Sequence, residues 1–209
     1  MIYPVMQQMP DGGMALIYNP PLPQGMHVTG GVTSGVVPGV DPARGPSPAH
    51  SARASTPRPP AIKLDRENEL AGLLHFSPHS VHYQRKTYPT ALHLLEALKF
   101  LEHQPDLAER IRTCATPEQA SEMAEAFRQH VRPDWEQVFL HMIDEALYWK
   151  FMQHPYLRRL LMDTGQVDLV FSDSDDSFWG DGPLGQGANH LGNALMRVRQ
   201  RLRAEGVHH

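Results

Sequence analysis

The proline and glycine content of the chain changes sharply near residue 61. Residues 1–60 contain 12 of the 19 prolines and 8 of the 16 glycines, but only five charged side chains. Proline fixes φ and lacks a backbone donor, so a segment this rich in proline and glycine sustains neither helix nor strand periodicity. We therefore predict a disordered, polyproline-like tail over residues 1–60 and a folded domain over residues 61–209. A solvated linker is the simplest interpretation of the tail, and a docking segment for a protein partner is the alternative.

The remaining composition limits the compartment and the classes of function. The chain has one cysteine among 209 residues, which excludes an internal disulfide framework and any multi-cysteine metal site. No run approaches the ~20 uncharged apolar residues of a membrane-spanning helix, and residues 1–5 lack the features of a secretory signal. A reducing cytoplasmic or nuclear compartment without membrane contact is therefore expected. The net charge of -4 makes non-specific duplex binding through a basic surface a poor fit.

Three histidines near residue 80 have a spacing that suits metal ligands. They are His75, His79 and His82. Pro78 prevents a regular helix between them, and no cysteine or carboxylate completes the ligand set. We therefore expect neither a metal site nor a metal cofactor at these residues.

The apolar spacing beyond residue 61 predicts a compact, mostly helical α+β domain with a few short strands. Val81 and Tyr83 alternate with polar residues before a polar turn, which indicates a hairpin that ends near Tyr88. Helices are predicted at about 90–101, 106–114, from 116 onward, and at about 134–154, 156–162 and 189–202. The apolar, β-branched stretch 167–171 is expected to form a strand.

Three of these helices carry recognisable starting signals. Thr116 is placed as an N-cap before a proline, and Gln119 lies where its side chain can bond back to the cap. Asp106 with Glu109 resembles a capping box. Asn189 is expected to cap the last helix, because asparagine is a favoured N-cap residue.

The stretch from Asp175 to Gly192 is the part of the sequence most informative about function. Its glycines allow close approach of a backbone to a ligand, and a helix beginning at its end presents free N–H groups to an anion. Trp179 lies between Asp176 and Asp181, so a stacking face stands beside hydrogen-bond acceptors, as a sugar or a nucleobase requires. The alternative is a polar surface loop whose tryptophan fills the core, and composition alone does not choose between these interpretations.

The sequence resembles the NADAR (YbiA-like) family across residues 73–203. The C-terminal signature of that family is matched by Trp179-Gly180-Asp181-Gly182, Gly187, Asn189 and Leu191-Gly192. Upstream, the match continues through Phe76-Ser77-Pro78, Tyr88-Pro89-Thr90, His93, Lys99, Ala115-Thr116-Pro117, Arg132, Asp134-Trp135, Lys150-Phe151 and Thr164-Gly165. The motifs occur in the family's order, and the proline-rich tail lies outside them.

This resemblance implies a compact, mostly helical α+β fold and an N-glycosidase activity that needs no cofactor. Family members hydrolyse the bond between ribose and a base in pyrimidine intermediates of riboflavin synthesis, and others remove ADP-ribose from guanine. The implied partners are therefore a ribosylated base, an ADP-ribose-containing small molecule or an ADP-ribosylated nucleic acid. Breaking a ribose C–N bond places positive charge on the sugar, which carboxylates stabilise, and negative charge on the leaving base, which a proton donor neutralises.

The resemblance also assigns roles to individual residues. Asp181 and Asp176 are the implied catalytic acids, and capping of the loop backbone is the alternative role for both. The implied substrate-binding residues are Phe76, Tyr88, Lys99, Arg132, Trp179, Gly180, Gly182 and Asn189, with Lys99 and Arg132 placed to hold phosphate. Lys99 and Arg132 are alternatively solvated surface charges, and helix capping alone would account for Asn189. Trp135 also matches the family, and its apolar helical stripe favours core packing.

Two family glutamates are replaced in this chain. One falls at Leu92, directly before the histidine of the first long helix, and the other falls at Phe171. Glu96 lies one turn after Leu92 on the same helix face and is the candidate replacement, displaced by ~6 Å along the axis. The alternative function is a module that binds ADP-ribose or a nucleotide without hydrolysing it.

Overall fold

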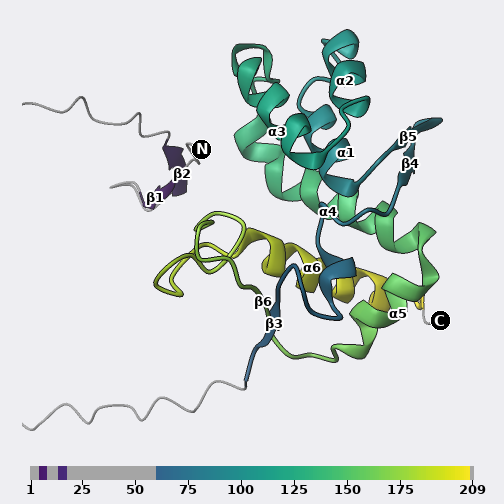
Figure 1. Ribbon diagram of the computed structural model, residues 1–209, viewed down its shortest axis with the longest axis vertical. Helices are drawn as coiled ribbons and strands as arrows, with labels where there is room; N and C mark the ends of the chain where they lie inside the picture. Colours follow the sequence, from purple (N-terminus) through teal and green to yellow (C-terminus); the bar gives the residue numbers. More distant parts are fainter. Residues whose placement is uncertain (1–4, 9–13, 18–59, 208–209) are drawn as a thin grey trace, which may run out of the picture.

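The computed structural model describes residues 5–8, 14–17 and 60–207 (Figure 1). Strand β1 (Val5–Gln8) pairs antiparallel with β2 (Met14–Ile17). These strands were not predicted from composition, but both segments lack proline and glycine, so a backbone ladder is open to them. The rest of the predicted tail lies outside the described residues, and the division at residue 61 stays a prediction.

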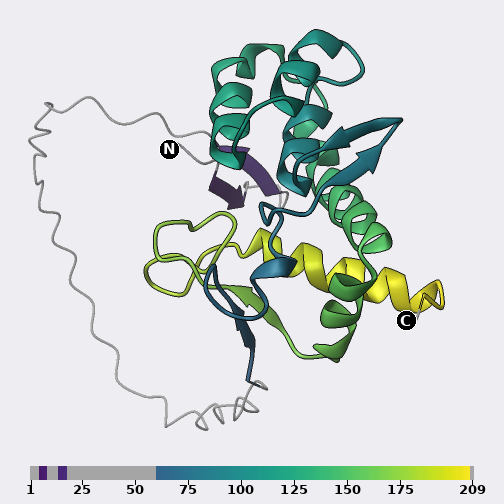
Figure 2. The same cartoon turned by 45° about the vertical axis from the view of Figure 1, so that its right-hand side comes forward.

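The domain is built around a long helix, α4 (Trp135–Gln153), which contacts helices on both sides of it. On one side lie α1 (Ala91–Leu98), α2 (Pro105–Arg112) and α3 (Pro117–Ala126). On the other lie α5 (Pro155–Asp163) and the last helix, α6 (His190–Ala204) (Figures 1 and 2). Two short 3₁₀ turns, Ala71–Leu73 and Arg128–His130, complete the helical part. No helix among the described residues is both long and apolar enough to cross a membrane.

Two short strand pairs complete the predicted α+β class. Strand β4 (Val81–Tyr83) and β5 (Lys86–Tyr88) form the predicted hairpin, in which Val81 faces Tyr88. Its two-residue turn has Gln84 at φ 46° and Arg85 at φ 64°, the left-handed geometry that matches the twist of a hairpin. Strand β3 (Ile62–Leu64) pairs in parallel with β6 (Leu169–Phe171), and joins the start of the domain to the segment before α6.

The predicted starting signals succeed at α3 and fail at α2. The Thr116 hydroxyl accepts the Gln119 N–H at 3.2 Å, and the Gln119 side chain accepts the Ala115 N–H at 3.1 Å. The capping box at Asp106 is wrong, because α2 begins one residue earlier and its N-cap is Gln104, whose side chain makes no capping hydrogen bond. Proline at the first helical position sets this start, since its fixed φ suits the first turn.

The remaining helices agree with the sequence within a few residues. The Thr90 hydroxyl caps α1 by accepting the His93 N–H at 3.2 Å, and α1 ends before the predicted residue 101. Proline 155 separates α4 from α5, as expected from its missing donor. The core is continuous between the two sides of α4, and Trp135 is 9% exposed within it, which confirms the predicted packing role.

Candidate active site

The Trp179 loop, residues 172–189 between β6 and α6, is held in shape by its own backbone. The Asp181 N–H donates to Phe171 O at 2.9 Å, and the Asn189 N–H donates to Gly180 O at 3.0 Å. A Cβ on Gly180 would lie 2.8 Å from Phe171 O, and Gly182 has a φ of +65°. Loop packing therefore explains both glycines, and their contact with substrate stays a prediction.

Both predicted loop acids are anchored by main-chain N–H groups. One oxygen of Asp176 accepts the N–H groups of Phe178 and Trp179 at 2.9 and 2.7 Å. Burial raises the pKa of Asp176 above its usual value, although these two hydrogen bonds oppose the shift. Asp181 accepts the Asp173 N–H at 3.1 Å. The loop thus presents two carboxylates in different environments. Such a difference allows one carboxyl to donate a proton while the other stays ionised and stabilises positive charge.

Trp179 belongs to an aromatic row that crosses the domain. We use this name for Trp135, Phe139, Trp179, His75 and Phe76. Neighbouring ring centroids lie 6.0 Å apart for Trp135 and Phe139, 5.7 Å for Phe139 and Trp179, 4.5 Å for Trp179 and His75, and 5.1 Å for His75 and Phe76. Trp179 is partly buried, so it packs against core rings and still reaches the surface. Trp179 can therefore fill part of the core and also offer a stacking face to a ligand.

Glu96 and Lys99 lie at one end of the aromatic row. The Lys99 Nζ is 5.5 Å from the centre of the Trp135 ring and 2.6 Å from Glu96 Oε2. This contact is an ion pair rather than a well-aligned hydrogen bond. Glu96 is only 6% exposed, and a carboxylate so deeply buried needs such a counter-charge. No hydrogen bond or ion pair joins Glu96 to the loop acids within residues 60–207.

The two positions that the sequence analysis matched to family glutamates, Leu92 and Phe171, are both apolar and buried. Leu92 is 7% exposed, and its N–H donates to the His75 carbonyl at 2.9 Å, so the start of α1 is tied to the aromatic row. Phe171 is 1% exposed, and its ring lies 6.0 Å from that of Phe76. Both positions are therefore filled with hydrocarbon, and their correspondence to family glutamates stays a prediction.

The backbone of Arg132 contacts that of Lys99, but the guanidinium of Arg132 pairs with other residues. Its N–H donates to Lys99 O at 3.0 Å. Its guanidinium binds the carboxylate of Asp134 through contacts of 2.6 and 2.9 Å, and lies 3.8 Å from Glu102. A bidentate pair of this kind uses the directional donors that a phosphate would otherwise take.

Two other predicted site residues have structural partners. Tyr88 is 1% exposed in the core, and burial raises its pKa, while the charge of Arg112 on α2 opposes the shift. Asn189 occupies the N-cap position of α6 at a φ of 48°, but its side chain makes no capping bond, which corrects that part of the prediction. Its amide instead accepts the Phe171 N–H and donates to Leu169 O, each at 2.9 Å, so it ties the helix start to β6.

Lys150 was not among the predicted site residues, but its side chain is completely buried. Its ammonium donates to Gly72 O at 2.7 Å, Leu74 O at 2.6 Å and Ser77 Oγ at 2.7 Å. Burial lowers the pKa of Lys150 from 10.5 to about 7. The sequence does indicate its burial, because a lysine three residues after Leu147 falls on the apolar stripe of a helix. Lys150 thus anchors the segment that carries His75 and Phe76.

His75 and Arg66 were also missed as site residues. His75 is 3% exposed, and its Nδ1 has no hydrogen-bond partner within the described chain. Burial, reinforced by the charges of Lys150 and Arg66, lowers the pKa of His75 from 6.5 to about 3, so the ring is neutral at physiological pH. Arg66 precedes the region of family resemblance, and no local motif marked it.

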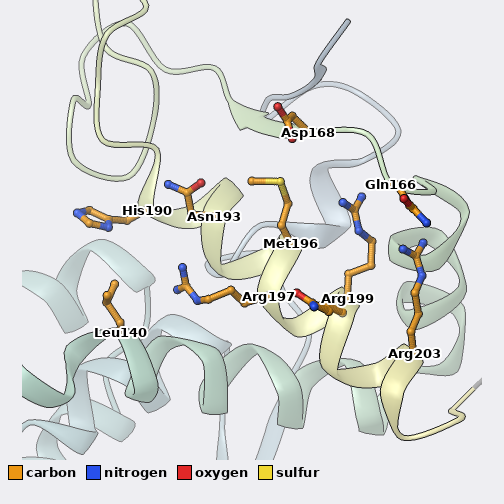
Figure 3. Close-up of a pocket in the computed structure, with 10 residues that line it drawn as sticks. Leu140, Gln166, Asp168, His190, Asn193, Met196, Arg197, Arg199 and Arg203 are labelled. Atoms are coloured by element: carbon orange, nitrogen blue, oxygen red, sulfur yellow. The ribbon is translucent and has the colours of Figure 1, made fainter. Parts of the chain in front are cut away.

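A separate surface depression of about 710 Å³ runs along α6 (Figure 3). Its walls are formed by Leu140, Gln166, Asp168, His190, Asn193, Met196, Arg197, Arg199, Gln200 and Arg203. Arg197 binds both oxygens of Asp144 at 2.7 and 2.8 Å, and Arg199 donates to Thr164 Oγ1 at 2.7 Å. None of the sequence-predicted site residues lines this depression, and its arginines have structural partners.

No group of three or more histidine, cysteine, aspartate or glutamate side chains in the described part of the chain is arranged to hold a metal ion. The site therefore offers carboxylates, aromatic rings and cations. Such a set suits binding of a charged, ring-containing ligand and proton transfer to it.

Comparison with known proteins links this arrangement to a family. Residues 68–203 match the NADAR domain family. The chain is 37% identical over 129 residues to an N-glycosidase of Nostoc punctiforme, across 61% of this chain and 83% of that protein. It is 37% identical over 130 residues to the N-glycosidase YbiA of Escherichia coli, across 62% of this chain and 80% of that protein. The chloroplastic riboflavin biosynthesis protein PYRR of Zea mays is 32% identical over 140 residues, across 61% of this chain and 22% of that longer protein.

A solved structure agrees with the fold. The NMR structure of the Escherichia coli protein YbiA superposes with a TM-score of 0.62 at 33% sequence identity. The superposition covers 70% of this chain and 88% of that one. The predicted resemblance and the predicted mostly helical α+β class are thereby confirmed.

Proposed function

The chain belongs to the NADAR domain family, and on that basis we propose that it is an N-glycosidase that hydrolyses the bond between a ribose and a base. The observation that carries this proposal is the 37% identity to two proteins named N-glycosidases. The span matched by the family model contains every site residue named from the sequence. The proposed substrates are a ribosylaminopyrimidine phosphate or a base that carries ADP-ribose, free or in nucleic acid.

The two loop acids take separate parts in the proposed reaction. The oxygen of a water molecule bonds to the anomeric carbon as the C–N bond breaks, and the bonding electron pair leaves with the base nitrogen. Asp176 delivers a proton to that nitrogen, a role favoured by the raised pKa that burial gives its carboxyl. Asp181 stabilises the positive charge that develops on the sugar. Trp179 offers a stacking surface for the base.

Glu96 is the proposed replacement for the family glutamate at Leu92. It lies one turn further along α1, and Lys99 holds its carboxylate at 2.6 Å. In this role Glu96 positions the attacking water and takes its proton. Lys99 then serves to orient Glu96, rather than to hold phosphate as the sequence indicated.

The test is a mass-spectrometric assay for release of free base by the purified full chain. The substrates are a ribosylaminopyrimidine phosphate and an oligonucleotide with ADP-ribosylated guanine. Asp176→Asn and Glu96→Gln are expected to lower kcat by roughly 10²- to 10⁴-fold, the usual contribution of a positioned acid or base. Asp175→Asn is the matched control, because this neighbouring carboxylate is exposed and outside the proposed machinery. Equal rates for Asp176→Asn and Asp175→Asn would contradict the proposed acid.

The second candidate function is binding of ADP-ribose or a nucleotide without hydrolysis. It is favoured by one observation, the burial of Leu92, at the position where the family resemblance implies a glutamate. In that case the unaltered chain releases no base, Leu92→Glu gains turnover, and Trp179→Ala abolishes saturable binding of ADP-ribose. Base release by the unaltered chain would instead exclude the binding-only function.

A further inference from the structure

The cations around the site differ in how far their charge is already engaged. Lys99 and Arg132 each lie 2.6 Å from a carboxylate oxygen. Arg66 and Lys63 approach their nearest carboxylates only at 3.7 and 4.0 Å, and their side chains are 59% and 69% exposed. Exposed ion pairs at such distances contribute little energy. Arg66 and Lys63 therefore keep most of their capacity to bind an anion.

Arg66 lies at the opposite end of the aromatic row from Lys99. Its Cζ is 4.4 Å from the centre of the Phe76 ring, which neighbours His75 and, through it, Trp179. The segment that follows β3 runs beside the Trp179 loop (Figures 1 and 2). Stacking on Phe76 restrains the guanidinium plane beside the proposed base-binding surface.

The acids near Arg66 and Lys63 place these cations without saturating them. Asp173 accepts the Asp175 N–H at 3.0 Å with one oxygen, and its other oxygen is the one nearest Arg66. Asp181 likewise accepts the Asp173 N–H with one oxygen and faces Lys63 with the other. Each carboxylate is thus shared between the main chain and a cation, and among the described residues neither Arg66 nor Lys63 has a short, aligned carboxylate partner.

We propose that Arg66, assisted by Lys63, binds the phosphate of a phosphorylated ribose whose base lies against Trp179. This inference rests on the proposed function, because it places the ribose near Asp181. The guanidinium fork matches two phosphate oxygens, which no single ammonium does. The phosphate is that of a ribose monophosphate or the pyrophosphate of ADP-ribose. Arg66 lies just before the span matched by the family, residues 68–203.

Binding measurements test the inference without requiring turnover. The full chain is titrated by calorimetry with ribose 5-phosphate, ADP-ribose and ribose. Arg66→Gln is expected to raise the Kd of the phosphorylated ligand by roughly tenfold to a hundredfold, as for loss of a hydrogen bond to a charged group. It is expected to leave the affinity for ribose unchanged. Comparison of the first two ligands identifies which phosphate source the subsite prefers.

Three controls make the outcome specific. Arg128→Gln removes an equally exposed arginine that pairs with Glu125, and should change no Kd. Arg66→Lys keeps the charge but loses the fork, so its Kd should fall between those of the unaltered chain and Arg66→Gln. Loss of the phosphate preference in Arg132→Gln but not in Arg66→Gln would overturn the proposal. So would an unaltered chain that binds ribose and the phosphorylated ligands equally.

The result is independent of whether the chain is an enzyme. Phosphate-dependent binding that Arg66→Gln removes, without any base release, would support the subsite and contradict the proposed hydrolysis. Base release with an unchanged KM for the phosphorylated substrate in Arg66→Gln would contradict the subsite alone.

Discussion

Lys150 has an ammonium group with no exposed surface, and the three oxygens that accept its hydrogen bonds are all neutral. Burying a charge without a carboxylate partner is costly, which is why burial lowers its pKa to about 7. The bonds tie α4 to the segment 72–77. A single residue thus couples the central helix to the backbone that presents His75 and Phe76.

The lowered pKa of Lys150 predicts that folding stability rises with pH above 7. Between about 7 and 9 the unfolded chain keeps a proton on this amine that the folded chain has lost, so the free energy of unfolding increases as pH increases. The slope is at most about 1.4 kcal/mol per pH unit. Urea unfolding at pH 7, 8 and 9 measures it, and Lys150→Met should show a flatter dependence.

The window for this measurement ends near pH 9. Burial raises the pKa of Cys114 above its usual 9.0, which lowers stability at higher pH and opposes the effect of Lys150. Identical slopes for Lys150→Met and the unaltered chain would show that Lys150 keeps its proton in the folded state. Below pH 6.5 both chains should lose stability, because His75 is held neutral in the folded state.

At the scale of elements, α2 and α3 begin in different ways. Both have proline at the first helical position, but only α3 has a side-chain cap, from Thr116 to the Gln119 N–H. Glu109, which the sequence placed in a capping box, instead pairs with Lys86 and Arg112. α2 therefore starts with a proline and without a side-chain cap, and Glu109 pairs with Arg112 of the same helix and with Lys86 of β5.

This difference predicts unequal costs for two alanine substitutions. Thr116→Ala should lower the free energy of unfolding by about 1 kcal/mol, the usual loss for an N-cap. Asp106→Ala removes no capping bond, so its effect should stay within about 0.5 kcal/mol. Chemical denaturation of the two variants measures both values. A cost for Asp106→Ala equal to that of Thr116→Ala would contradict the assigned start of α2.

At the scale of the whole molecule, β3 connects the beginning of the domain to the site. The Ile62 N–H donates to Asp168 O, and Leu64 O accepts the Ser172 N–H, each at 2.8 Å. Leu64 is completely buried in the core. The strand therefore supports β6 and the first residue of the Trp179 loop from a position more than 100 residues away in the chain.

Deletions that end on either side of β3 should have very different effects. A chain that begins at residue 60 keeps β3 and should change Tm by no more than about 2 °C. A chain that begins at residue 66 loses a buried leucine and the parallel pair, so its Tm should fall by roughly 5 °C or more. Calorimetry of both fragments is the measurement. An equal fall in both would mean that residues before 60 stabilise the domain.

The sequence by itself determined the features that depend on neighbouring residues. The Thr116 cap, the break at proline 155 and the hairpin ending at Tyr88 each rest on contacts within a few residues, so residue type and order suffice to predict them. The family resemblance likewise followed from motifs read in order, and it made the Trp179 loop the candidate region of the site.

Only the tertiary structure decided which side chains take partners across the fold. Asn189 binds the backbone of β6, Lys150 binds the segment 72–77, and Arg66 stacks on Phe76. Local sequence does not encode these contacts, because each depends on which surfaces are buried together. Burial removes competing water, and an asparagine, lysine or arginine then binds whichever polar group or ring the packing places beside it.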